Sequence, residues 1–149
     1  MLDLIMSGFI PVTQLPLDPY QVFHVHAGRE RMSAPSAFRS LFGPRGYGFH
    51  AGVDLVAPAG APVAAAAPGR VVWAGYRAGG WGLLVTIAHR DGVRTMYAHL
   101  SRVGVRLGER VAAGARVGRV GATGDATGPH LHFEVRLRGA AVDPLPALR

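Results

Sequence analysis

The amino-acid sequence predicts an all-β fold made mainly of antiparallel sheets. Short runs rich in Val and aromatic residues alternate with turns, in line with the 21 Gly and 11 Pro spread along the chain. No segment shows a long apolar period of 3.6 residues, so amphipathic helices are not expected. The 149 residues, 49% of them apolar, are enough for one real core and argue against disorder.

The chain is expected to divide into an N-terminal segment, residues 1–35, and a second domain, residues 36–149. The segment is irregular, because it is interrupted by Pro11, Pro16, Pro19 and Pro35. Its one plausible strand is YQVFHVHAG. A lone strand needs a neighbour, so we expect Tyr20 to His26 to extend the outer edge of the domain's sheet. The alternative is that this strand folds across the functional site and blocks it.

The beginning of the chain, MLDLIMSGFIPV, is apolar but too short to span a bilayer. It lacks a basic region and contains Asp3, so we expect neither a signal peptide nor an integral membrane segment here.

From Phe38 onwards, apolar runs closed by Gly, Asp or Pro predict a series of strands. RDG, residues 90–92, is typical of a hairpin turn. The Ala-rich stretch APVAAAAPG is bracketed by Pro62 and Pro68, which favours a strand or loop over a helix. The strands expected with most regular patterns cover residues 69–75, 82–89, 93–100, 102–111, 115–121 and 130–137.

Charge and composition exclude several classes of function. The net charge is +7 and every basic residue is Arg, which favours polyanions in general, but these Arg are scattered singly without stacking aromatics, so no nucleic-acid partner is expected. The absence of Cys excludes disulfides, thiolate zinc sites and a Cys nucleophile. Some Gly-turned strands resemble biotinyl and lipoyl carrier domains, but such domains need an acceptor Lys, and the chain has none.

The stretch TGPHLHFEV carries two histidines one residue apart. Side chains alternate between the faces of a strand, so His130 and His132 point the same way, and the intervening apolar residues point into a core. Glu134 follows on the histidine face, where it is placed to orient a metal-binding ring as a hydrogen-bond acceptor.

Upstream, FHAGVDL places His50 four residues before Asp54. Gly52 between them leaves room where a Cβ atom would crowd an ion. Two histidines and a carboxylate, with a fourth position left for water, are typical of a catalytic zinc. The residues therefore predict one Zn²⁺ per chain held by His50, Asp54 and His132. His99, in MYAHLS, and His130 remain free to move a proton or to stabilise an oxyanion.

Three motifs, HxGxD (50–54), YAHL (97–100) and TGPHLHFE (127–134), resemble those of the lysostaphin-type (LytM-like, β-lytic) zinc metalloendopeptidases, which cleave peptidoglycan. The resemblance covers residues 38–144. It implies a lysostaphin-type peptidase domain of the duplicated hybrid motif, with a groove over one sheet, and action outside the cytoplasm. It also implies the same zinc ligands, with His99 and His130 as catalytic residues. One departure is Leu83, at a position where family members often carry Asn.

Two roles stay open at this point. His130 is the candidate base and His99 the candidate partner for the oxyanion or the leaving amine, but these roles are interchangeable. The alternative function is a non-catalytic module of the same fold that binds the wall or activates a hydrolase. Such modules generally lose zinc ligands, whereas all five polar residues are present here, so activity is favoured.

The other histidines are expected to have no part in the site. FHVHAG has the same spacing as the later pair but no HxxxD partner, so His24 and His26 are interpreted as ordinary strand or surface residues. His89, at the mouth of the predicted hairpin, is interpreted as structural.

Overall fold

The structure is a computed structural model that describes residues 26–27, 30–31, 38–40, 43–45 and 48–144. Over these residues the regular elements are strands and a single 3-10 turn, which confirms the all-β prediction. No helix in the described part of the chain is long and apolar enough to cross a membrane.

In chain order the strands are β1 (His26–Ala27), β2 (Glu30–Arg31), β3 (Phe38–Ser40), β4 (Gly43–Arg45), β5 (Gly48–His50), β6 (Val53–Val56), β7 (Pro62–Ala64), β8 (Gly69–Arg77), β9 (Gly82–Ala88), β10 (Val93–Val103), β11 (Arg110–Val111), β12 (Arg116–Val120), β13 (His130–Leu137) and β14 (Ala140–Val142).

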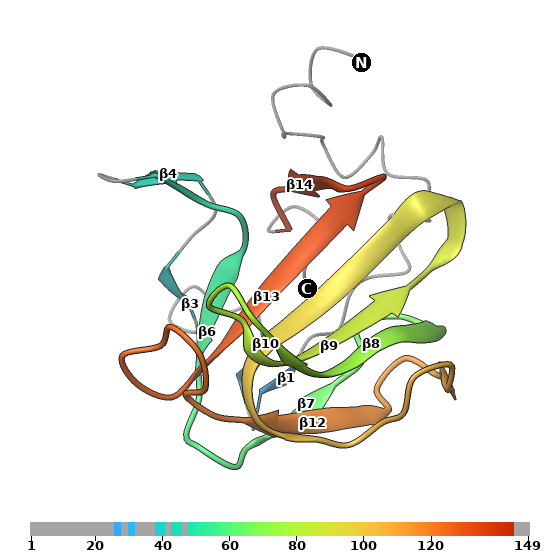
Figure 1. Ribbon diagram of the computed structural model, residues 1–149, viewed down its shortest axis with the longest axis horizontal. Helices are drawn as coiled ribbons and strands as arrows, with labels where there is room; N and C mark the ends of the chain where they lie inside the picture. The colour runs from blue at the N-terminus through green and yellow to red at the C-terminus, as the bar shows by residue number, and fades with distance from the viewer. Residues whose placement is uncertain (1–25, 28–29, 32–37, 41–42, 46–47, 145–149) are drawn as a thin grey trace.

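Strand β10 is the centre of the antiparallel sheet (Figure 1). It pairs with β9 along one side, and on the other side with β13 over its first half and with β12 over its second half. Strand β8 continues the sheet beyond β9, and β6 continues it beyond β13. The paired strands β6, β13 and β10 therefore bring together segments that lie far apart in the sequence.

The main core lies on one face of these strands. Leu131, Phe133 and Val135 of β13 are fully buried, as the alternation of this strand predicts. The ring of Tyr97 packs against that of Phe133 with centroids 5.4 Å apart. The opposite face carries a smaller apolar cluster with the imidazoles beside it, and this second face becomes the floor of the functional site.

Most of the expected strands are present, and that over residues 130–137 coincides with β13. The continuous strand expected over residues 102–111 is wrong. Strand β10 ends at Val103, and the chain then turns before the two-residue strand β11. Gly108 adopts a φ of +87°, in the left-handed region, and its N–H donates to the carbonyl of Val71. Alternating valines cannot extend a strand through a residue in that conformation.

The turn expected at residues 90–92 is confirmed as η3 (Arg90–Gly92), which joins β9 to β10. The stretch that begins at Pro62 forms the short strand β7 and then an irregular connection, as expected. The short strands β3, β4, β5 and β14 escape the sequence pattern, because three residues are too few to display an alternation.

The proposed strand from Tyr20 lies outside the described residues except for its last residue, His26, and His24 lies outside them too. His26 begins β1, which pairs with β2 and, through Ala27 and Val63, with β7. This pairing fits an accessory edge strand, which stays a prediction, as does the division of the chain at residue 35.

His89 belongs to a hydrogen-bonded chain beneath the sheet, which confirms its structural role. Its Nδ1–H donates to the carbonyl of Pro68 at 2.7 Å, and its Nε2 accepts from the Thr95 hydroxyl at 2.7 Å. Thr95 in turn accepts from the Tyr97 hydroxyl at 2.9 Å, and Tyr97 accepts from the N–H of Ala66 at 2.8 Å. Every donor faces an acceptor, provided that His89 is neutral. Burial raises the pKa of Tyr97 to about 12, so its hydroxyl stays protonated.

Tyr97→Phe is expected to destabilise the fold by about 1–3 kcal/mol, because it leaves the N–H of Ala66 buried without an acceptor. The free energy of unfolding in urea measures this loss. Tyr76→Phe is the matched control, since 69% of the surface of Tyr76 is exposed. Equal stability of the two variants would show that the chain of hydrogen bonds contributes nothing.

His89 is expected to make the fold sensitive to acid. Burial lowers its pKa from the ordinary 6.5. The stability that this group contributes is therefore complete above about pH 6.5 and is lost as the pH falls through the folded-state pKa. Thermal melts from pH 8 to pH 5 should fall more steeply for the wild type than for His89→Gln, which cannot gain a proton. Parallel profiles would contradict this account.

Candidate metal centre and active site

One strand pairing and one short turn assemble the predicted zinc ligands. His132 of β13 lies directly opposite Asp54 of β6 in the antiparallel register, and His50 ends β5, just before the turn into β6. Gly52 lies in this turn. A Cβ atom there would lie 2.3 Å from the carbonyl oxygen of Phe133 and 2.8 Å from Cγ of Glu134. The glycine is therefore needed mainly because the turn crosses close over β13, and less for the space around an ion.

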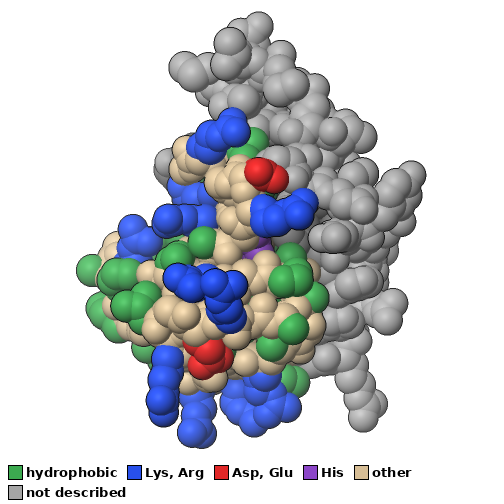
Figure 2. All heavy atoms as spheres, turned by 90° about the vertical axis from the view of Figure 1, so that its right-hand side faces the viewer, with side chains coloured by type: hydrophobic (Ala, Val, Ile, Leu, Met, Phe, Trp, Pro, Cys, Tyr) green, Lys and Arg blue, Asp and Glu red, His purple; other side chains and the backbone are tan. Residues whose placement is uncertain are grey.

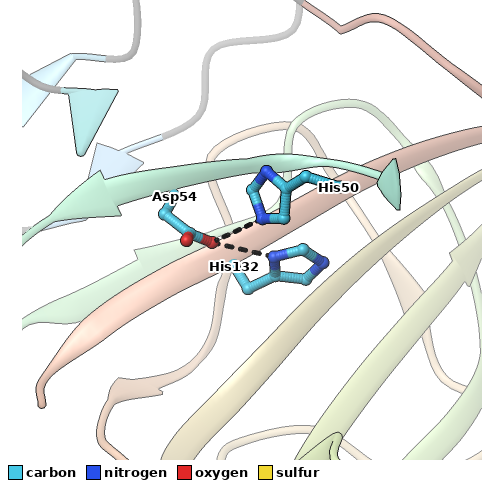
Figure 3. A group of neighbouring side chains, drawn as sticks. All are labelled: His50, Asp54 and His132. Atoms are coloured by element: carbon cyan, nitrogen blue, oxygen red, sulfur yellow. Dashed lines mark hydrogen bonds and ion pairs between the residues drawn. The ribbon is translucent and has the colours of Figure 1, made fainter. Parts of the chain in front are cut away.

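The three side chains point at one another (Figure 3). Nε2 of His50 lies 3.4 Å and Nδ1 of His132 lies 2.8 Å from the same oxygen of Asp54, and the three ligand atoms all lie within 4.8 Å of one another. Tetrahedral ligands about 2.0–2.2 Å from one zinc ion are separated by about 3.3–3.6 Å. The donor set and its spacing therefore fit one zinc ion after small adjustments.

Glu134 orients His132 from behind, as its place on the histidine face predicts. Its buried carboxylate accepts from Nε2 of His132 at 2.9 Å, and its other oxygen accepts from Nε and Nη2 of Arg136, both at 2.8 Å. A carboxylate on the far nitrogen fixes the tautomer of a metal-binding imidazole and leaves Nδ1 for the metal.

Burial and hydrogen bonds shift the pKa values of Asp54 and His132 in the triad. Burial raises the pKa of Asp54, but the hydrogen bonds and charges of His132 and His50 outweigh it and hold the pKa well below the usual range. For His132, burial lowers the pKa, and the hydrogen bonds to Asp54 and Glu134 raise it to about 9. A metal ion must therefore displace a proton from His132.

His99 enters the site through a bulge in β10. Tyr97 and Leu100 both face the main core, whereas Ala98 faces the opposite side, so one extra residue interrupts the alternation. That residue is His99, whose φ of +59° is in the left-handed region and whose N–H donates to the carbonyl of Trp81. The bulge turns the imidazole to the side of the metal ligands, 5.7 Å from the ring of His132. Strained backbone of this kind is common at active sites.

His99 and His130 are held alike. Nδ1–H of His99 donates to the carbonyl of Thr123 at 2.8 Å, and Nδ1–H of His130 donates to the carbonyl of Gly128 at 2.9 Å. Since a carbonyl only accepts, the neutral rings leave Nε2 without a proton. Nε2 of His130 lies 3.6 Å from the Asp54 oxygen, and the two rings lie 4.9 Å apart. Burial lowers the pKa of His99.

All six predicted residues line one cavity of about 560 Å³. Sequence reasoning missed Trp81, whose ring lies edge-on to His132 at 6.1 Å, and Asp125, in the loop before β13. The sequence GGWG, with Trp between flexible residues, was the available signal. Leu83 offers no polar side chain, but its N–H donates to the Thr123 hydroxyl at 3.0 Å, and neither residue is among those that line the cavity.

Comparison with known proteins places this site in a family. Residues 48–144 match the family model described as peptidase family M23. The DD-carboxypeptidase/endopeptidase Mpg of Neisseria gonorrhoeae is 44% identical over 115 residues, which cover 77% of this chain and 26% of Mpg. The chain thus spans about a quarter of the length of that relative.

Two solved structures show the same fold. Lysostaphin from Staphylococcus simulans aligns with a TM-score of 0.69 and 37% identity over 73% of this chain and 47% of that one. A zinc containing peptidase from Vibrio cholerae aligns with a TM-score of 0.71 and 31% identity over 83% of this chain and 39% of that one. These matches confirm the resemblance and the zinc prediction, and the chain belongs to peptidase family M23.

Proposed function

We propose that this chain is a zinc-dependent endopeptidase that hydrolyses the peptide stems or cross-bridges of bacterial peptidoglycan. The observation that carries the proposal is the meeting of the triad His50, Asp54 and His132 with two further imidazoles in one cavity. The similarity to an endopeptidase and to lysostaphin supports it.

In this proposal His50, Asp54 and His132 hold the zinc, and Glu134 keeps Nδ1 of His132 facing it. When bound, zinc supplies a Lewis acid that polarises a carbonyl group and makes water more acidic.

His130 and His99 carry the proton transfers. The Nδ1–H of each imidazole donates to a carbonyl, which keeps Nε2 aimed into the cavity. One of them takes the proton of the attacking water. The other stabilises the developing oxyanion or gives a proton to the leaving amine. The separation of 4.9 Å between the rings leaves both within reach of one scissile peptide group.

The site of action is proposed to be the cell envelope, outside the cytoplasm, because that is where the wall peptide lies. Fractionation of cells that make the native protein tests this, and quantitative recovery in the cytosol would count against it.

Digestion of purified peptidoglycan tests the reaction. The zinc-loaded chain should release fragments with new peptide amino and carboxyl termini, identified by mass spectrometry, and a chelator should stop their release. New reducing sugar ends, or no fragments from fully zinc-loaded protein, would contradict the proposal.

A further inference from the structure

A second cavity, of about 420 Å³, adjoins the metal cavity. Trp81 lines both, and Glu134 of the first cavity holds Arg136 of the second. His132, Glu134 and Arg136 are every second residue of β13 and lie on one face of it, so the two cavities share one floor. We call the second cavity the arginine pocket, because the residues that line it include Arg77, Arg94, Arg136 and Arg138.

The arginine pocket concentrates positive charge. None of the described residues that line it is acidic. Arg94 lies directly opposite Arg136 in the β10–β13 pairing, and Glu134 balances the charge of Arg136 but not that of Arg94. On the face seen in Figure 2, Arg side chains predominate over acidic ones. The guanidinium of Arg77 is fixed over the rings of Trp73 and Trp81, at 5.5 and 5.8 Å.

Arg138 occupies a backbone position that suits another residue. It lies with Gly139 in the two-residue turn between β13 and β14, and both adopt left-handed conformations, with φ of +49° and +87°. Turns of this type favour Asn-Gly, and Arg there strains the backbone. The arginine therefore lowers the stability of the turn while its side chain lines the pocket.

Thr86 offers an unused hydrogen bond beside these cations. It lines the pocket from β9, opposite Met96, and is only 4% exposed. Its hydroxyl oxygen is the buried side-chain polar atom that has no hydrogen-bond partner within the described part of the chain. A hydroxyl among guanidinium groups is suited to an oxyanion.

We propose that the arginine pocket binds a carboxylate of the peptide substrate. Arg136 follows His132 by four positions, about 13 Å along the strand. An extended peptide covers that span with about four residues. The bound carboxylate thus lies about four residues from the scissile bond, which favours stem peptides with free carboxylates over uncharged glycyl bridges. This assignment rests on the proposed function.

Two synthetic peptides test the pocket with the zinc-loaded full chain. They share one scissile bond and differ in a carboxylate or a carboxamide four residues away. We expect a KM about tenfold lower for the acidic peptide, with kcat unchanged. Arg94→Gln and Arg138→Asn should each reduce this preference about five-fold. Arg106 is an exposed arginine in the turn after β10, and Arg106→Gln should leave the preference intact. Arg138→Asn should also raise Tm by about 2–4 °C, since Asn suits the turn.

Equal KM values of the wild-type protein for the two peptides would overturn the assignment. So would an Arg106 variant that loses as much of the preference for the acidic peptide as the Arg94 and Arg138 variants do. Equilibrium binding of the same peptides separates it from the proposed function. Arg94-dependent binding of the acidic peptide without hydrolysis supports the pocket and contradicts the peptidase. Arg94-dependent binding of inorganic phosphate, with no preference between the peptides, marks a free-anion site and overturns the substrate role.

Discussion

His132→Ala is expected to abolish zinc binding and hydrolysis together. Its Nδ1 lies 2.8 Å from Asp54 and its Nε2 is held by Glu134, so the imidazole is both a proposed ligand and the link to the supporting carboxylate. Two remaining ligands are too few for the catalytic zinc arrangement, which uses three protein ligands. Loss of the ring also leaves the buried Glu134 without one of its partners.

Metal analysis after dialysis, run beside a hydrolysis assay, measures this effect. The wild type should retain one zinc per chain and the variant none. His24→Ala is the matched control, because its histidine pair lacks an HxxxD partner. Zinc loss in the control, or zinc retained by the His132 variant, would show that the ligands are misassigned.

Removal of either imidazole proposed to be catalytic, His130 or His99, is expected to leave zinc bound and to reduce the rate by about 10²-fold or more, the usual contribution of a general acid or base. For His130 the replacement is His130→Ala. For His99 the better replacement is His99→Asn, since Asn tolerates the left-handed φ of +59° and keeps the bulge. The loss should fall on kcat, because neither residue is needed to hold the metal.

Zinc content and Tm of these variants separate a chemical loss from a structural one. Both should match the wild type within error. Near-normal turnover in the His99 variant would mean that the YAHL motif positions the wall of the site and takes no part in the proton transfers.

The sequence predicts the clustering of His50, Asp54 and His132 well because their arrangement depends on short-range rules. Alternation along β13 separates the histidine face from Leu131 and Phe133, and the HxxxD spacing confines His50 and Asp54 to one turn. Only the pairing of β6 with β13 is long-range. It is implied once Asp54 and His132 are assigned to one metal site, because their strands must then lie close together.

Other features depend on tertiary contacts that no local pattern reveals. The bulge at His99 exists because Leu100 must return to the core. The N–H of His99 donates to the carbonyl of Trp81, 18 positions earlier in the chain. Gly52 is needed mainly because the backbone of β13 lies so close to it. The arginine pocket joins β8, β9, β10 and the β13–β14 turn, so its residues look like scattered charges in the sequence.

The measurement that tests the central claim most directly is a zinc titration of peptidoglycan hydrolysis. Metal-free protein is supplied with increasing equivalents of zinc, and the rate of appearance of new peptide termini is followed. The rate should rise from zero in proportion to zinc and level off at one equivalent per chain. Hydrolysis by the metal-free protein, or no new termini at full zinc occupancy, would contradict the assignment of this chain as a zinc endopeptidase.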